Sequence, residues 1–502
     1  METTEIAILG AGPTGIGAAL RLRELARGDF LLIDAADSPG GLASSCVDDH
    51  GFTWDLGGHV QFSHYRKFDD YMDLAFPASG WLWHERESWI WLKDRFIPYP
   101  FQNNLHRLEP ADRWRAVEGL MRDALHGVPE NFEQWIQASF GAGIAELFML
   151  PYNRKVWAHP LDSLDFRWVG ERVAPVTLEQ AVKSICFGED QVSWGPNRRF
   201  RFPLNGGTGA IWRSLAARIP SHNLRLSTRV ESIDAARRIL HTATGEIHYR
   251  ALISTAPLTW LTRATRDEEL TARTRGLKSS SVHVIGLGLH GAPPESIAKK
   301  CWMYFPSAET SFYRVTVFSH YSPNNVPSPG SMWSLMAEVS ESEHQGRDRE
   351  NLVENAVSEM VAGGLIPEAG AIISRWHKTL TPGYPTPSLE RDSILSAVLP
   401  ALESKNIFSR GRFGAWKYEV SNQDHSFMQG VEAVDRILHG CAEPTLDQPG
   451  LVNQRYNPFP YAANRDLMNL CESISSESPA REGAGGSPVL IPTFSQDQKG
   501  QP

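Results

Sequence analysis

An α/β fold is predicted for this chain of 502 residues, and three observations near its start carry the prediction. An apolar run at residues 6–9 leads into a glycine turn, and a helical segment follows that turn. A second apolar run, residues 30–33, then ends at Asp34. A strand, a helix and a second strand in this order are typical of a parallel sheet covered by helices.

The glycine turn itself predicts a dinucleotide site. Gly10 permits the tight turn, Gly12 lets a pyrophosphate approach the backbone, and Gly15 lets the helix pack against the strand. Asp34 stands nineteen positions after Gly15, where an acidic side chain can accept a hydrogen bond from a ribose hydroxyl. Taken alone, this turn indicates redox chemistry.

A second glycine turn, Ser-Pro-Gly-Gly-Leu-Ala at residues 38–43, follows the second strand. It favours a flavin over a nicotinamide cofactor, because a flavin dinucleotide runs on past the pyrophosphate; an ordinary turn is the alternative interpretation. The pair Gly57-Gly58 then precedes His59, which places an ionisable ring on a flexible loop.

Composition excludes several classes of partner. The formal charge of −9, without a cluster of lysine and arginine, argues against nucleic-acid binding. Five scattered cysteines predict reduced thiols rather than a disulfide framework or a metal site. The sequence shows neither a signal peptide nor an apolar run of about 18 residues, so a cytoplasmic protein without a membrane partner is expected.

The remainder of the chain divides by its patterns. Helical spacing covers residues 105–190, strand-like runs occupy 280–400, and a late strand (407–416) and helix (430–438) would complete the first fold element. The predicted parts are a discontinuous dinucleotide-binding domain (1–95, 200–275 and 400–455), a mainly helical substrate domain (96–199), an antiparallel sheet domain (276–399) and a disordered tail (472–502).

Eight longer motifs are spread over these parts. They are GGHVQFSHY (57–65), PYPFQNN (98–104), PYNRKVW (151–157), GERV (170–173), WGPN (194–197), GYPTP (383–387), GRFG (411–414) and NQDHSF (422–427). Through them the chain resembles the UDP-galactopyranose mutases of the longer eukaryotic type over residues 5–455.

The resemblance implies a Rossmann-like FAD-binding domain, a helical uridine-binding domain and an antiparallel β-sheet substrate domain. It also implies an isomerase that interconverts UDP-galactopyranose and UDP-galactofuranose. In this family N5 of reduced FAD attacks the anomeric carbon and UDP leaves, and NADPH serves as the reductant. The sugar on UDP stays open between galactose, a 6-deoxy sugar and arabinose.

The resemblance also assigns residues. It gives His59, Arg172 and Arg314 catalytic roles, the two arginines as clamps on the departing diphosphate. The implied substrate contacts are Phe62, Tyr99, Gln102, Asn153, Trp157, Asn197, Trp302, Tyr304, Tyr321, Tyr384 and Tyr418. The implied cofactor contacts are Gly10, Gly12, Pro13, Thr14, Gly15, Asp34, Gly41, Leu42, Ala43, Gly58, Arg412, Asn422, Gln423 and Ser426. Arg86 and Ser88 match NADPH contacts.

The chain departs from the family pattern in three places. Asn205 stands where an arginine is expected, Ala210 where a glycine is expected, and the loop at 322–331 is short. Family members range from dimers to tetramers, which allows a homo-oligomer without choosing one. Two other hypotheses remain: a flavin oxidase of the amine-oxidase or protoporphyrinogen-oxidase type, with an apolar substrate cavity, and a catalytically silent nucleotide-sugar binding protein.

Overall fold

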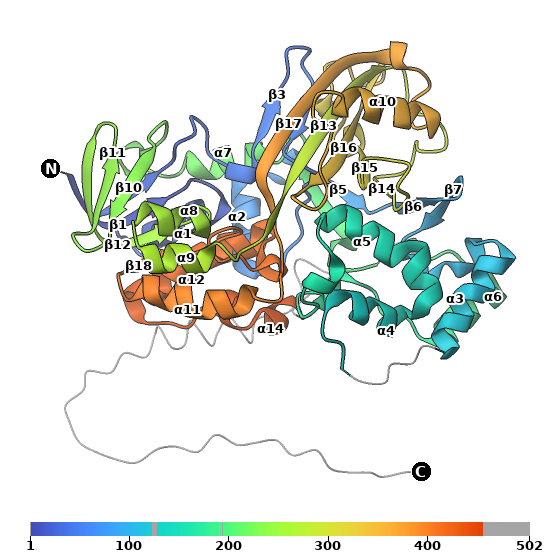
Figure 1. Cartoon of the computed structure of the whole chain (residues 1–502). Helices are drawn as coiled ribbons and strands as arrows, with labels where there is room; N and C mark the ends of the chain where they lie inside the picture. The colour runs from blue at the N-terminus through green and yellow to red at the C-terminus, as the bar shows by residue number, and fades with distance from the viewer. Residues whose placement is uncertain (1, 123–127, 193, 455–502) are drawn as a thin grey trace, which may run out of the picture. The chain divides into compact units, whose positions relative to one another are not determined.

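The first sheet holds the predicted strand–turn–helix–strand unit (Figure 1). The structure is a computed structural model, which describes residues 2–122, 128–192 and 194–454. Strand β1 (Glu2–Leu9) lies between β12 (Gly245–Ser254) and β2 (Phe30–Ile33), with β9 (Leu224–Arg225) beyond β2, and all these pairs are parallel. The start of β12 pairs antiparallel with β11 (Ile239–Thr242), which continues to β10 (Val230–Asp234).

The late segment completes this sheet, as the sequence predicts. Strand β18 (Ile407–Ser409) pairs in parallel with the end of β12. Helix α12 (Gln423–His439), which contains the predicted helical segment 430–438, crosses α1 (Pro13–Glu24). The crossing needs glycine, because a Cβ on Gly430 would lie 1.9 Å from the carbonyl oxygen of Thr14.

Further helices pack around the first sheet. They are α2 (Arg66–Ala75), α7 (Gly209–Ala216), α8 (Leu258–Ala264), α9 (Glu268–Thr274), α11 (Arg391–Glu403), α13 (Pro444–Asp447) and α14 (Pro449–Asn453). The strand pair β3 (Ser45–Val47) and β4 (Thr53–Asp55) packs through Trp54 against the second sheet, described next. Helix α7 follows the glycine turn at 206–209, where a helix is expected.

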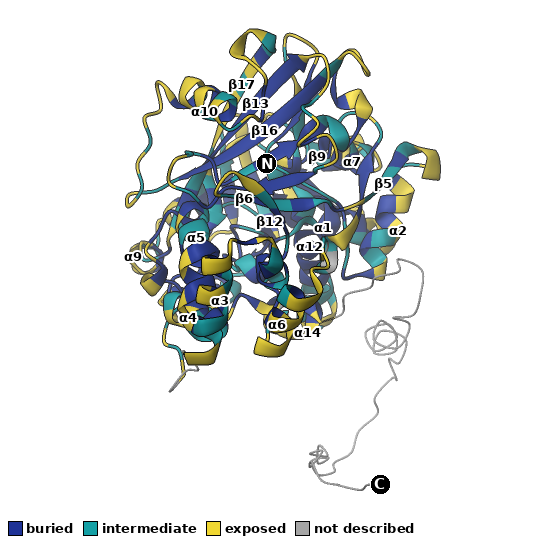
Figure 2. Ribbon diagram, turned by 90° about the vertical axis from the view of Figure 1, so that its right-hand side faces the viewer, coloured by how far each residue is buried: buried dark blue, intermediate teal, exposed yellow. Residues whose placement is uncertain are grey.

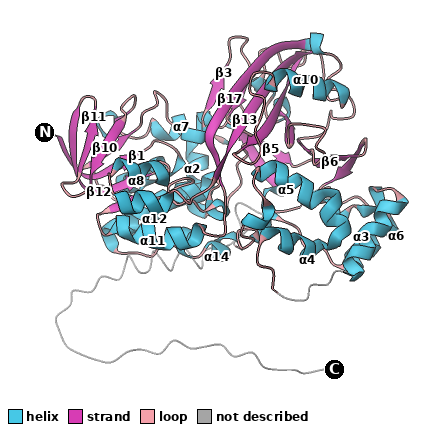
Figure 3. Cartoon of the chain, in the orientation of Figure 1, coloured by secondary structure: helices cyan, strands magenta, loops and turns pink. Residues whose placement is uncertain are grey.

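The second sheet supplies strands that line one side of the cavity described below (Figure 3). Its order is β17 (Ile372–Pro385), β13 (Ser279–His290), β16 (Met332–Glu341), β15 (Arg314–Val317), β14 (Trp302–Tyr304), β6 (Ser88–Leu92) and β7 (Arg95–Pro98). Helix α10 (Leu352–Ala362) follows β16 in the chain. The pairs are antiparallel except β14–β6, which is parallel. The two strands lie far apart in the chain, which leaves room for the crossover that a parallel pair needs.

The second sheet therefore includes two strands, β6 and β7, that lie outside the predicted sheet domain of residues 276–399. The domain division itself stays a prediction. Residues 81–85 form β5 (Trp81–Glu85), which pairs with β8 (Arg199–Pro203) in a separate ribbon.

The predicted helical stretch contains α3 (Pro110–Arg122), α4 (Phe132–Ile144), α5 (Leu150–Trp157) and α6 (Leu178–Phe187). Figure 2 shows its exposed outer faces beside the buried strands of the second sheet. None of the helices within the described ranges is long and apolar enough to cross a bilayer. The predicted disordered tail, 472–502, lies outside the described residues.

Candidate active site

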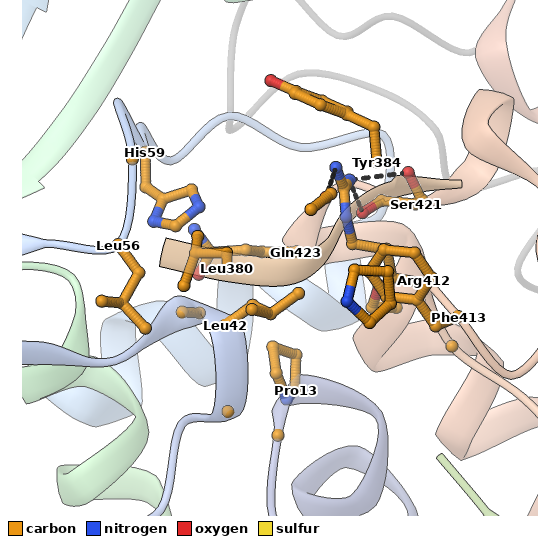
Figure 4. Close-up of a pocket in the computed structure, with 18 of the residues that line it drawn as sticks. Pro13, Leu42, Leu56, His59, Leu380, Tyr384, Arg412, Phe413, Ser421 and Gln423 are labelled. Carbon is orange, nitrogen blue, oxygen red and sulfur yellow. Dashed lines mark hydrogen bonds between the residues drawn. The ribbon is translucent and has the colours of Figure 1, made fainter. Parts of the chain in front are cut away.

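A cavity of about 820 Å³ lies where the glycine turn after β1 meets the second sheet. Its walls come from the turns at 10–14 and 41–43, the loop at 56–62, the end of β17 and residues 411–426. In Figure 4, His59 and Arg412 lie on opposite sides of it, and Pro13 and Leu42 lie below them. The volume falls at the upper end of the range for small-molecule sites, as a dinucleotide and a second ligand would require.

The glycines of the first turn have two different roles: Gly10 and Gly15 are required by the backbone, and Gly12 leaves room for a ligand. Gly10 has φ +103°, and a Cβ on Gly15 would lie 1.9 Å from the Gly10 carbonyl oxygen, so both glycines are required by the backbone itself. A Cβ on Gly12 would meet no heavy atom nearer than 3.9 Å, yet Gly12 lines the cavity. The space that this Cβ would enter is the space that a pyrophosphate would take, so the turn fits the dinucleotide.

Asp34 closes the same turn. Its Oδ2 accepts a hydrogen bond from Ala11 N at 2.6 Å, and its Oδ1 accepts one from Ala36 N at 2.7 Å. A carboxylate offers about four acceptor positions, so both oxygens keep capacity for a ribose hydroxyl. Asp34 therefore both orders the turn and stays available at the cavity wall.

The loop at 57–64, which we call the histidine loop, brings His59 to the cavity. Burial lowers the pKa of His59 to about 4; Glu338 opposes this shift, whereas Arg412 and Arg314 add to it. The imidazole is therefore neutral at neutral pH. Its buried Nδ1 has no hydrogen-bond partner among the described residues, which leaves it for a bound group.

Four arginines among the described residues line the cavity: Arg172, Arg229, Arg314 and Arg412. Arg172 lies in the C-terminal half of the helical stretch, and Arg412 follows strand β18. Arg172 donates from Nη2 to the carbonyl oxygen of Glu419 at 2.7 Å and lies 5.0 Å from the ring centre of Tyr418. Its buried Nε has no partner within the described ranges. Arg412 donates to Ser421 Oγ at 3.0 Å and lies 4.9 Å from the ring centre of Tyr384 (Figure 4).

Arg314, another of the cavity arginines, is held by a residue that sequence reasoning missed. Glu338 accepts from Arg314 Nε at 3.0 Å and from Nη2 at 2.6 and 2.7 Å. Burial would raise the pKa of Glu338, but the charge of Arg314 and hydrogen bonds from Tyr313, Arg314 and Gly58 outweigh it and lower that pKa. Nothing in the local sequence marks Glu338, since it is one of several polar residues in strand β16.

Most of the predicted contacts lie together on this cavity. They are Gly10, Gly12, Pro13, Thr14, Asp34, Gly41, Leu42, Ala43, Gly58, His59, Phe62, Arg172, Asn197, Trp302, Arg314, Tyr384, Arg412, Tyr418, Asn422, Gln423 and Ser426. The others are absent from its walls: Gly15, Arg86, Ser88, Tyr99, Gln102, Asn153, Trp157, Tyr304 and Tyr321.

The family resemblance implies that Tyr99, Gln102, Asn153 and Trp157 contact uridine, and none of the four lines this cavity. Trp157 packs edge-on against Tyr418, with ring centres 4.8 Å apart. Asn153 Nδ2 donates to the carbonyl oxygen of Met149 at 2.8 Å, and Gln102 Nε2 donates to that of Ala174. The NH2 groups of both amides are therefore engaged by the backbone, whereas the buried Oε1 of Gln102 has no hydrogen-bond partner among the described residues. The assignment of these residues to uridine stays a prediction.

Arg86 lies inside the protein rather than at its surface. Its side chain donates to Asn197 Oδ1 and to the carbonyl oxygen of Trp194, and it lies between the rings of Tyr99 and Trp302, at 5.3 and 5.5 Å from their centres. Ser88 is buried as well.

Two other predicted positions have local explanations. Tyr321 is buried in an aromatic cluster with Phe200 and Phe202. Asn205 accepts from Asn324 Nδ2 at 2.8 Å, which joins the departure at 205 to the short loop.

A buried group of His64, Asp424 and His425 joins the histidine loop to α12. Its side-chain atoms lie close enough to hold a metal ion, but Asp424 Oδ2 already accepts from His64 Nδ1 at 2.7 Å and from His64 N at 3.0 Å. These are hydrogen bonds of ordinary length. The expectation of no metal site stays a prediction.

Comparison with known proteins agrees with this fold and cavity. The family model described as flavin containing amine oxidoreductase matches residues 13–438, so the fold and the site define a flavoprotein of this class. Among solved structures, the chain is similar to a reduced UDP-galactopyranose mutase, with 46% identity and a TM-score of 0.87 over 90% of this chain and 98% of that one. The chain belongs to the UDP-galactopyranose mutase family.

More distant structures share the fold alone. A putative protoporphyrinogen oxidase from Exiguobacterium sp. 255-15 is 16% identical, with a TM-score of 0.67 over 87% of this chain and 99% of that one. A CLA-producing fatty acid isomerase from P. acnes is 14% identical, with a TM-score of 0.60 over 87% of this chain and 99% of that one.

Proposed function

We propose that this protein interconverts UDP-galactopyranose and UDP-galactofuranose, or a close UDP-sugar pair, with FAD as its cofactor. The observation that carries the proposal is that Arg172 and Arg314 line the same cavity as the dinucleotide turn and His59. A cavity with a cofactor turn on one side and two guanidinium groups on another suits a phosphorylated substrate.

When bound in its reduced form, FAD supplies a nucleophilic nitrogen for the anomeric carbon. The departing UDP then needs fixed positive charge, which Arg172 and Arg314 provide without losing a proton at any working pH. By analogy with oxyanion-hole donors, each arginine is worth ~3–4 kcal/mol of barrier. The diphosphate must also stay bound, since it returns to the sugar.

Tyr384 and Tyr418 complete the diphosphate site. Burial raises the pKa of Tyr384 although Arg314 and Arg412 oppose it, so the hydroxyl keeps its proton and can donate to phosphate. The ring of Tyr418 meanwhile packs against the guanidinium of Arg172 and helps to orient it.

Asn197 and Trp302 flank the space left for the sugar, and neutral His59 lies at its cofactor side. A neutral imidazole adds no charge against the arginines and can accept or donate one hydrogen bond. These few contacts leave the identity of the sugar to experiment.

Three finer assignments belong to the proposal. We propose NADPH as the physiological reductant with Arg86 and Ser88 near its path, the cytoplasm as the location, and a homo-oligomer as the assembly. They rest on the family resemblance, and each needs its own measurement.

The amine-oxidase alternative shares only the fold. It requires an apolar substrate cavity, whereas this one presents Arg172, Arg314 and Arg412. The silent binding-protein alternative requires loss of a key group, and His59, Arg172 and Arg314 all line the cavity.

The test is an interconversion assay. The dithionite-reduced protein is incubated with UDP-galactopyranose or UDP-galactofuranose, with the oxidised protein as control, and products are separated by chromatography. Interconversion by the reduced protein alone supports the proposal. Oxygen-coupled oxidation of an amine without any furanose product would refute it.

A further inference from the structure

Glu338 connects two parts of the site that the sequence keeps far apart. Its Oε1 accepts from the backbone N–H of Gly58 at 3.0 Å and from Arg314. Its Oε2 accepts from Arg314 Nη2 and, at 2.6 Å, from the hydroxyl of Tyr313. One carboxylate, 2% exposed, therefore holds both the anion clamp and the histidine loop.

The strand register of the second sheet sets the positions of Arg314 and Glu338. Arg314 on β15 and Glu338 on β16 are direct partners in the antiparallel register. The backbone N–H of Tyr313 also donates to the carbonyl oxygen of Glu338 at 3.0 Å. The two side chains therefore rise side by side from rigid strands, and neither depends on a loop for its position.

The contact leaves part of the guanidinium available. Glu338 engages Nε and Nη2 of Arg314, while Nη1 makes no hydrogen bond to any described residue. A guanidinium is a rigid planar fork, so holding one edge orients the remaining nitrogen. Arg314 lines the cavity, and we read Nη1 as the donor that remains for an anionic ligand.

The histidine loop is tied at both ends. Glu338 holds Gly58 near its start, and Asp424 accepts from the backbone N–H and Nδ1 of His64 at its end. His59 lies between these ties. A Cβ on Gly58 would lie 3.2 Å from Trp302 Nε1 and 3.3 Å from Glu338 Oε1, so the loop already packs closely at this point.

We infer that Glu338 is a positioning residue that sets the Arg314 guanidinium and the histidine loop at a fixed spacing across the cavity. It does not contact substrate in this role; it acts through Arg314 and Gly58. The inference rests on the proposed function, because that function makes Arg314 the diphosphate clamp.

The role predicts an unusual kinetic signature for Glu338→Gln. The change removes a negative charge beside the diphosphate site, so UDP should bind as tightly as before or more tightly. The same change releases Arg314 and Gly58 from their fixed spacing, so kcat should fall about tenfold or more. A residue that only supports folding would weaken binding and turnover together.

The experiment uses FAD-loaded, dithionite-reduced enzyme. It measures kcat and KM for UDP-galactofuranose, the Kd for UDP by competition, the flavin absorption spectrum with and without UDP, and the FAD content. Glu341→Gln is the matched control. Glu341 lies on the same strand and pairs with Arg349 at 2.8 Å and His283 at 2.9 Å, but it is not part of the cavity wall.

The inference holds if Glu338→Gln lowers kcat while its Kd for UDP is below the wild-type value or within about threefold of it. The flavin spectrum of this variant on UDP binding should also differ from that of the wild type. Glu341→Gln should keep wild-type values in each measurement. It is overturned if kcat per bound FAD stays within about twofold of the wild type, or if both variants lose it equally.

Glu338→Asp is the second variant if Glu338→Gln does not retain FAD. It keeps the charge but is too short to hold both partners, so an intermediate kcat supports the inference and wild-type kcat overturns it. The wild type serves as the separate test of function. If it does not interconvert the two sugars, the proposed function fails, while the UDP affinities of the variants still report whether Glu338 acts on Arg314.

Discussion

The two sides of the cavity are built in different ways. On the first sheet, the cofactor side is built mainly from a backbone turn, with φ +103° at Gly10 and an open Cβ position at Gly12. The Asp34 carboxylate orders this turn by accepting a hydrogen bond from Ala11 N. On the second sheet and the helical stretch, the opposite side consists of long side chains, with Arg172, Arg314 and Glu338 as its charged members.

This difference explains which interactions tolerate substitution. A backbone cradle depends on the absence of side chains within one short segment, so one added methyl group damages it. The anion site depends on charge and on partners that lie far away in sequence, such as Glu338 for Arg314. The following predictions test this contrast, from the largest expected effect to the smallest.

Arg314→Ala should reduce kcat about a hundred- to a thousandfold, because a fixed charge on the leaving diphosphate is lost. The FAD content should stay normal, since Arg314 belongs to the other side of the cavity. Steady-state kinetics with the reduced enzyme checks this. Arg349→Ala, at an arginine that pairs with Glu341, is the control. Near-normal turnover of Arg314→Ala would contradict the proposed diphosphate role.

Gly15→Ala should destabilise the protein by about 3 kcal/mol, because its Cβ would meet the Gly10 carbonyl oxygen at 1.9 Å and backbone cannot easily yield. Gly12→Ala is the matched comparison. It should leave the stability of the FAD-free protein unchanged but weaken FAD binding, since its Cβ enters the cavity. Urea unfolding and FAD titration separate the two. Equal loss of stability in both variants would break the distinction between packing and recognition.

The stability of the protein should fall on acidification partly through His59. Its native pKa of about 4 lies below the unfolded value near 6.5, so between these values only the unfolded chain takes up the proton. This costs about 2 kcal/mol between pH 7 and pH 5. His59→Asn should lose that part of the pH dependence in urea unfolding, whereas His50→Asn, at an exposed turn, should not. An unchanged slope in His59→Asn would show that His59 is not held neutral.

Arg86→Lys should raise the KM for the sugar nucleotide about threefold even when dithionite replaces NADPH. The reason is that Arg86 holds Asn197 and lies between two aromatic rings. Lys93→Gln, at an exposed lysine of the same region, is the control. A defect that appears only with NADPH would assign Arg86 to reductant binding instead.

Much of the fold follows from local patterns. The strand at Phe30–Ile33, the helix after the turn at 206–209 and the helical stretch before 190 are all encoded by short-range periodicity. The parallel pairing of β6 with β14 was not predicted, because a strand partner depends on neighbours distant in sequence.

The sequence by itself determined the cofactor turn and the family, because a backbone cradle and motif spacing are properties of contiguous residues. Only the tertiary structure decided that Glu338 joins Arg314 to Gly58, that Arg86 is buried, and that the predicted uridine contacts do not line the cavity. The physical reason is that these relations arise from strand register and packing between segments, which bring side chains together regardless of their separation along the chain.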